Sequence, residues 1–169
     1  MTTSAVLPKR YMGSGFEGPN SPGVSTDSDK IGKMFRDLAE HRLGSATGQA
    51  RIADPQSELL QLFQDCSQPN WDGEGAVPIS AATLQEAQRL LEVIPQTIGV
   101  PDLIPEAMGS VAFEWYIAPG RVYVLSLSGR KRLEYAGLLG EGNETHGYWF
   151  YGGELPRLAG EHLRELYDH

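Results

Sequence analysis

Hydrophobic residues recur with the period of an α-helix before about residue 100 and with the alternation of a β-strand in much of the chain after it. The helical period predicts three amphipathic helices, over residues 29–43, 54–66 and 80–95. Asp54 and Pro55 suit the N-cap and the first turn of the second helix. Ser80 suits the N-cap of the third helix, and Pro95 suits its end.

Alternation of apolar and polar residues predicts strands because successive side chains of a strand point to opposite faces of the sheet, so the apolar ones gather on one face. The predicted strands cover residues 111–117, 121–127, 131–138 and 146–151, and a closing helix covers residues 155–167. The connections are short and rich in glycine, which favours antiparallel pairing of successive strands. The predicted fold class is therefore α+β, with an antiparallel four-stranded meander sheet and helices before and after it packed on one face.

The segment that precedes these elements differs in composition. Residues 1–28 are rich in Gly, Ser, Pro and Thr and have no usable hydrophobic period. We therefore expect residues 1–50 to be a largely disordered N-terminal extension that contains the amphipathic helix 29–43. That helix could pack on the domain or bind something else. We expect residues 51–169 to form a single α+β domain.

Charge narrows the range of partners. The 169 residues carry a net charge of −8. Residues 52–169 hold seven Lys/Arg against seventeen Asp/Glu, a net charge of −10. An acidic domain argues against direct binding of nucleic acid and suits a basic protein partner.

The chain also lacks the sequence signals of export and membrane insertion. No apolar run approaches the roughly 20 residues that cross a bilayer. Residues 1–12 hold no apolar segment of signal-peptide length, and Cys66 is the single cysteine. We expect a cytoplasmic protein without a membrane partner.

The loop Asn70–Ser80 combines glycines, an indole and two carboxylates directly before a helix. Its candidate residues are Trp71, Asp72, Gly73, Glu74 and Gly75. In a structural interpretation Trp71 anchors the loop in the core and Asp72 bonds the turn backbone. In a functional interpretation Asp72 and Glu74 bind a hard cation or act in acid–base chemistry. The loop lacks the full spaced set of an EF-hand, so we predict no metal site.

This loop and a downstream strand carry a resemblance. Residues 71–76 read W-D-G-E-G-A, and residues 109–115 read G-S-V-A-F-E-W. Together they resemble a group of small uncharacterised bacterial proteins with a W-D-G-x-G-A loop and a G-x-V-x-x-E-W strand. The resemblance spans roughly residues 57–155. It implies the fold and carries no activity, ligand or catalytic residue.

The remaining candidate residues are aromatic and lie in the predicted sheet. They are Tyr116, Tyr123, Tyr135, Trp149 and Tyr151, with Glu114 beside them. Tyr and Trp suit partner surfaces because they combine a large apolar area with a polar group. Such rings also fill the core of a small domain or a homodimer interface. Alternation places Glu114 on the face opposite Trp115, where we expect it to pair with Arg121, Arg130 or Arg132.

Two hypotheses of function follow. The leading hypothesis is a non-enzymatic accessory protein or inhibitor, similar in role to an antitoxin, that binds another protein through an aromatic sheet face. The alternative is a small hydrolase or ligand-binding enzyme that uses Asp72, Glu74 and Glu114. Cys66 and the histidines form no nucleophile or zinc motif, and we predict no catalytic residue and no cofactor.

Overall fold

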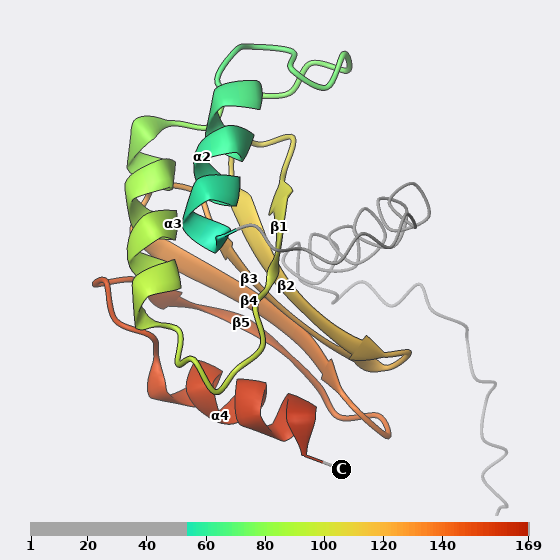
Figure 1. The fold of residues 1–169 in the computed structure, drawn as a ribbon. Coiled ribbons are helices and arrows are strands. Elements are labelled where there is room, and N and C mark those ends of the chain that lie inside the picture. Colours follow the sequence, from blue (N-terminus) through green and yellow to red (C-terminus); the bar gives the residue numbers. More distant parts are fainter. Residues whose placement is uncertain (1–53, 169) are drawn as a thin grey trace, which may run out of the picture. The chain divides into compact units, whose positions relative to one another are not determined.

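A computed structural model describes residues 54–168 of the chain, and Figure 1 shows their arrangement. Two helices come first, then five strands, then a last helix. The helices are α2 (Pro55–Asp65), α3 (Ala81–Val93) and α4 (Arg157–Tyr167). The strands are β1 (Asp102–Pro105), β2 (Val111–Ala118), β3 (Arg121–Leu127), β4 (Arg132–Leu139) and β5 (Glu144–Phe150).

The predicted caps of α2 and α3 are confirmed. The carboxylate of Asp54 accepts a hydrogen bond from the backbone N–H of Ser57 at 3.3 Å, and Pro55 opens the helix. The hydroxyl of Ser80 accepts from the backbone N–H of Thr83 at 3.0 Å. Each side chain satisfies a donor that the first turn of a helix leaves without a partner.

The five strands form one antiparallel sheet in the order β1-β2-β3-β4-β5, so every strand pairs with its neighbours in sequence. This confirms the α+β class and the antiparallel meander. The predicted number of four strands is wrong because β1 adds a fifth at the edge, with Leu103 opposite Phe113. β1 has only four residues and ends in Pro105, and a proline is tolerated there because an edge strand has a side without ladder bonds.

The helices pack on one face of the sheet, which we call the helix-covered face. Its central side chains are Phe113, Trp115, Tyr123, Leu125, Leu127 and Leu133, all of them buried. Leu59 of α2, Leu90 of α3 and Leu163 of α4 are fully buried in the same cluster. Figure 1 shows α2 and α3 side by side across one end of this face and α4 at its other end.

Arg121 holds the end of α4 against the sheet. Its Nε and Nη2 atoms donate to the carbonyl oxygen of Leu166 at 3.1 and 2.6 Å, and Nη2 also donates to that of Glu165 at 2.9 Å. The last carbonyl groups of a helix have no partner within the helix, and a guanidinium satisfies several of them at once.

Two predictions fall on residues that the structure does not describe. The predicted extension 1–50 and its helix 29–43 both lie outside the described residues. Within residues 54–168, none of the helices has the length and apolar character that crossing a bilayer requires.

Candidate functional site

The Trp-Asp-Gly loop closes on itself through Asp72. Its Oδ1 atom accepts hydrogen bonds from the backbone N–H groups of Glu74 at 2.8 Å and Ala76 at 3.0 Å. These backbone donors lower the pKa of the Asp72 carboxyl below its usual range, because they favour the ionised form. Gly73 and Gly75 have φ values of +80° and +98°, which allow the chain to turn around this carboxylate.

The neighbouring side chains also bond within the loop. The Oδ1 atom of Asn70 accepts from the backbone N–H of Gly75 at 2.6 Å. The indole N–H of Trp71 donates to the carbonyl oxygen of Val77 at 3.1 Å, and its half-buried ring packs against the core. The structure thus gives Trp71, Asp72 and both glycines roles in shaping the loop, whereas Glu74 is exposed.

The predicted aromatic residues do not share one surface. Tyr123, Tyr135 and Trp149 lie on the helix-covered face, as their register and their places in the core cluster show. Tyr151 is buried just after β5. Tyr116 alternates with Trp115 and therefore lies on the opposite side of the sheet, the second face.

The rings on the helix-covered face form a stack against α4. Tyr135 and Trp149 lie parallel with their ring centroids 3.9 Å apart. Tyr123 contacts the ring of His162, and its hydroxyl oxygen lies 3.1 Å from Nδ1 of that histidine. Burial raises the pKa of Tyr123 and lowers the pKa of His162, so burial favours the neutral form of both groups.

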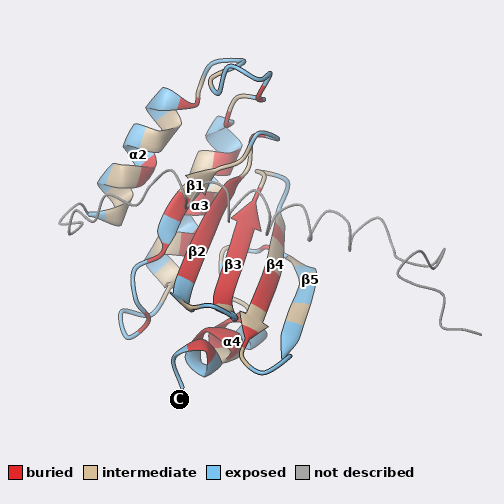
Figure 2. Cartoon of the chain, turned by 90° about the vertical axis from the view of Figure 1, so that its right-hand side faces the viewer, coloured by how far each residue is buried: buried red, intermediate tan, exposed pale blue. Residues whose placement is uncertain are grey.

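The second face holds the side chains that alternate with the core residues. They are Asp102, Ile104, Ala112, Glu114, Tyr116, Val122, Val124, Ser126, Arg132, Glu134, Ala136, Leu138, Glu144, His146, Tyr148 and Phe150. Figure 2 looks onto this face, with α3 behind the strands. Its centre, on β2 to β4, is buried, and its margin on β5 is exposed.

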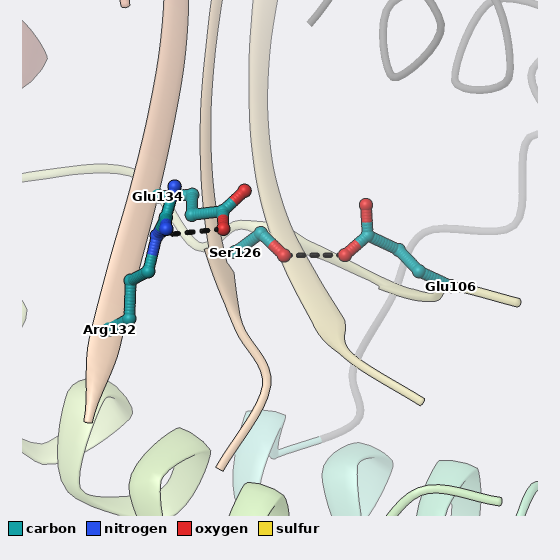
Figure 3. Close-up of polar contacts among 4 residues, drawn as sticks. All are labelled: Glu106, Ser126, Arg132 and Glu134. Atoms are coloured by element: carbon teal, nitrogen blue, oxygen red, sulfur yellow. Dashed lines mark hydrogen bonds and ion pairs between the residues drawn. The ribbon is translucent and has the colours of Figure 1, made fainter. Parts of the chain in front are cut away.

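Two polar pairs lie on the second face, drawn in Figure 3. The hydroxyl of Ser126 donates to Oε2 of Glu106 at 2.5 Å. Nε of Arg132 lies 3.0 Å from Oε1 of Glu134. The guanidinium carbon of Arg132 also lies 4.0 Å from the centroid of the Tyr148 ring, which is the geometry of a cation–π contact.

Arg121 is one of three alternative partners predicted for Glu114, and the strand register excludes it. Glu114 lies on the second face, as predicted, but Arg121 alternates with Val122 and points to the helix-covered face. There it donates hydrogen bonds to the end of α4, a contact that no local sequence pattern predicts. Arg132 does share the face of Glu114, and its nearest carboxylate is that of Glu134.

The exposed margin of the second face carries two rings that the predicted site did not contain. Tyr148 is 60% exposed and Phe150 is 77% exposed, on the edge strand β5. Both alternate with Trp149, which is half-buried on the other face. The alternation within residues 146–151 was a usable signal, because it separates Tyr148 and Phe150 from Trp149.

A small hollow lies between α3 and the end of β5. It has a volume of about 120 Å³ and is lined by Glu86, Arg89, Lys131, Phe150, Tyr151, Gly152 and Gly153. Burial, with the nearby Glu86 carboxylate as a further cause, raises the pKa of Tyr151 to about 12. Pockets for drug-sized ligands have volumes of roughly 300 Å³ or more, so this hollow suits a few water molecules.

The groups that metal or thiol chemistry would need are dispersed in the part of the chain that the structure describes. Residues 54–168 contain no cluster of three or more His, Cys, Asp and Glu side chains that could hold a metal ion. Cys66 is buried in the core, and burial, with the nearby Asp65 as a further cause, raises the pKa of its thiol. A raised pKa keeps a thiol protonated and unreactive at neutral pH.

Comparisons of this chain with models of protein families, with curated proteins and with solved structures found no match. The resemblance of the two sequence motifs to small bacterial proteins therefore stays a prediction. The function has to be argued from the geometry of the second face.

Proposed function

We propose that this protein is a non-enzymatic binding protein that contacts another protein through the exposed margin of its second face. The supporting observation is the pair of exposed rings, Tyr148 and Phe150, side by side on an edge strand. Exposed aromatic side chains are enriched at protein interfaces, and an edge strand also offers backbone N–H and C=O groups to a partner.

The polar surroundings of these rings suit specific recognition. Arg132 lies over the Tyr148 ring, and its Nε atom forms an ion pair with Glu134 at 3.0 Å. An apolar centre with charged groups at its rim is typical of an interface in which the rim fixes orientation. The net charge of −10 over residues 52–169 further suits a basic partner protein, to which this chain would bind as an accessory protein or inhibitor.

The hydrolase alternative gains no support from the geometry. Asp72 already accepts two backbone hydrogen bonds in its own loop. Glu114 is buried on the second face in the middle of β2. The two loop carboxylates and Glu114 therefore lie in different settings, and the hollow beside Tyr151 is lined by none of the three.

Affinity capture from the native cell with matched baits tests the proposal. The baits are the wild-type chain, the double variant Tyr148→Ser with Phe150→Ser, and the control Met108→Ser. Met108 is 79% exposed and lies on the loop between β1 and β2. Its substitution therefore also removes exposed apolar surface, but at a place away from the two rings. We expect a protein that is captured by the wild type and the control and is lost with the double variant.

The melting temperature of each bait separates recognition from folding. Both rings are largely exposed, so the double variant should melt within a few degrees of the wild type. A partner that binds the double variant as well as the wild type would refute the proposed surface.

A further inference from the structure

The two edges of the sheet are protected to different degrees. At one edge, β1 has only four residues and ends in Pro105, and both features limit further pairing. At the other edge, β5 has seven residues, contains no proline or lysine, and keeps an unbroken register with β4. Figure 2 shows β5 along the margin of the sheet, and within residues 54–168 no strand pairs with its outer side. The fold therefore presents β5 as a strand that can accept another.

The hydrogen bonds at the two ends of β5 show which of its backbone groups point outward. The N–H of Tyr151 donates to the carbonyl oxygen of Lys131 at 2.8 Å. The N–H of Leu139 donates to the carbonyl oxygen of Asn143 at 2.8 Å. Residues of an antiparallel strand alternate between bonding to the neighbouring strand and pointing away from it. The residues whose backbone groups point away from β4 are therefore Glu144, His146, Tyr148 and Phe150, whose side chains lie on the second face.

The charges at the two ends of β5 suit a second copy of the same chain. Glu141 and Glu144 are exposed where the strand begins. Arg130 and Lys131 are exposed beside its other end, on the turn that leads into β4. When two such strands pair antiparallel, the acidic end of each lies beside the basic end of the other. Parallel pairing would instead bring like charges together.

We propose that the β5 strands of two copies of this chain pair antiparallel about a two-fold axis at Gly147. In this register His146 lies opposite Tyr148 of the second copy, and Glu144 lies opposite Phe150 of the second copy. Every residue of β5 whose backbone groups point outward then has a partner, and one sheet continues through both copies. Directly opposite residues share a face, so the exposed rings of both copies lie on one continuous second face. The pairing therefore does not depend on whether another protein binds those rings.

The molar mass of the purified full chain, measured by light scattering during size-exclusion chromatography, tests this proposal. We expect twice the mass of one chain at high concentration and a shift towards the mass of one chain on dilution. His146→Pro removes an outward-pointing N–H donor and no bond to β4, so it should stay folded but have the mass of one chain where the wild type is dimeric. His146→Ala is the matched control because it removes the same exposed side chain and keeps the donor. It should remain dimeric.

Charge reversal gives a second test that leaves the backbone intact. Glu144→Lys places a cation at the acidic end of β5 and should raise the dissociation constant of the dimer several-fold. Glu74→Lys makes the same change in the Trp-Asp-Gly loop and should leave that constant unchanged. The proposal is overturned if the wild type has the mass of one chain at every concentration. It is also overturned if folded His146→Pro or folded Glu144→Lys dimerises as tightly as the wild type, since the contact would then lie elsewhere.

Discussion

At the scale of single residues, the Trp-Asp-Gly loop shows how a polar side chain can serve the backbone. Asp72 accepts from two N–H groups that the tight turn would otherwise leave without partners. The loop delivers the chain directly to the N-cap of α3 at Ser80. We therefore interpret the motif as a device that sets the start of a helix.

The stability contributed by Asp72 should depend on pH. Its pKa is lower in the folded than in the unfolded protein, so the contribution is present above the unfolded value of about 3.9 and is lost as the pH falls through the folded value. Asp72→Asn should lower the melting temperature at pH 7. The difference from wild type should shrink towards pH 2.5 in a series of thermal melts.

Glu74→Gln is the control for that series because its side chain is exposed in the same loop. It should leave the melting temperature at pH 7 nearly unchanged. An equal loss in both variants would mean that overall charge, and not the turn hydrogen bonds, sets the effect.

Gly137 illustrates a constraint of space. A Cβ atom at this position of β4 would lie 2.5 Å from Cδ2 of the Tyr123 ring, which is fully buried. Gly137→Ala should cost about 1–3 kcal/mol in the free energy of unfolding, measured with urea. Gly152→Ala is the matched control, since nothing lies within 4 Å of a Cβ there, and an equal cost in both would contradict this reasoning.

At the scale of elements, the packing of α4 on the sheet includes a side chain that titrates. His162 is buried between α4 and the sheet, and burial lowers its pKa. The folded state therefore holds the imidazole neutral, and its stability is present above the unfolded pKa of about 6.5 and falls below it. With Nδ1 protonated, the imidazolium can only donate in its hydrogen bond with the Tyr123 hydroxyl.

Thermal melts between pH 7.5 and 5 should show this loss. His162→Gln should flatten the decline because the substituted side chain does not titrate in this range. His146→Gln, on the exposed side of β5, should leave the decline as it is in the wild type. A decline of the same size in all three proteins would assign it to other groups.

The sequence predicted the positions of the helices and strands better than the contacts between them. Ser80 with the apolar spacing behind it, and the alternation from Val111 to Trp115, are local signals, and both elements formed where they were expected. The strand β1 was not predicted because it is short and contains a proline. The placement of Tyr123, Tyr135 and Trp149 depends on which face the helices cover, and no single strand encodes that choice.

The candidate site was harder to predict for the same reason. A strand that is rich in aromatic residues is equally consistent with an exposed surface and with a buried core. Only the register separated the exposed Tyr148 and Phe150 from the half-buried Trp149. Arg121 is a further case, since its contact with the end of α4 joins residues 45 positions apart.

At the scale of the whole molecule, the exposed edge strand β5 favours aggregation. An edge strand with an exposed phenyl ring is a template for association between chains. Phe150→Asp should raise the temperature at which the protein aggregates, measured by light scattering, with little change in its melting temperature. Met108→Asp removes an equally exposed side chain from a loop, and it should not protect.

The meander also bears on how quickly the protein reaches its native state. Each strand pairs with the one before or after it, so the ladder bonds of the sheet join residues close in sequence. Sheets with such local pairings fold faster than those that must first close long loops. The slowest contacts to find are those that join distant parts of the chain, such as α4 with β3 through Tyr123 and His162. Docking of the last helix against β3 should therefore follow formation of the sheet.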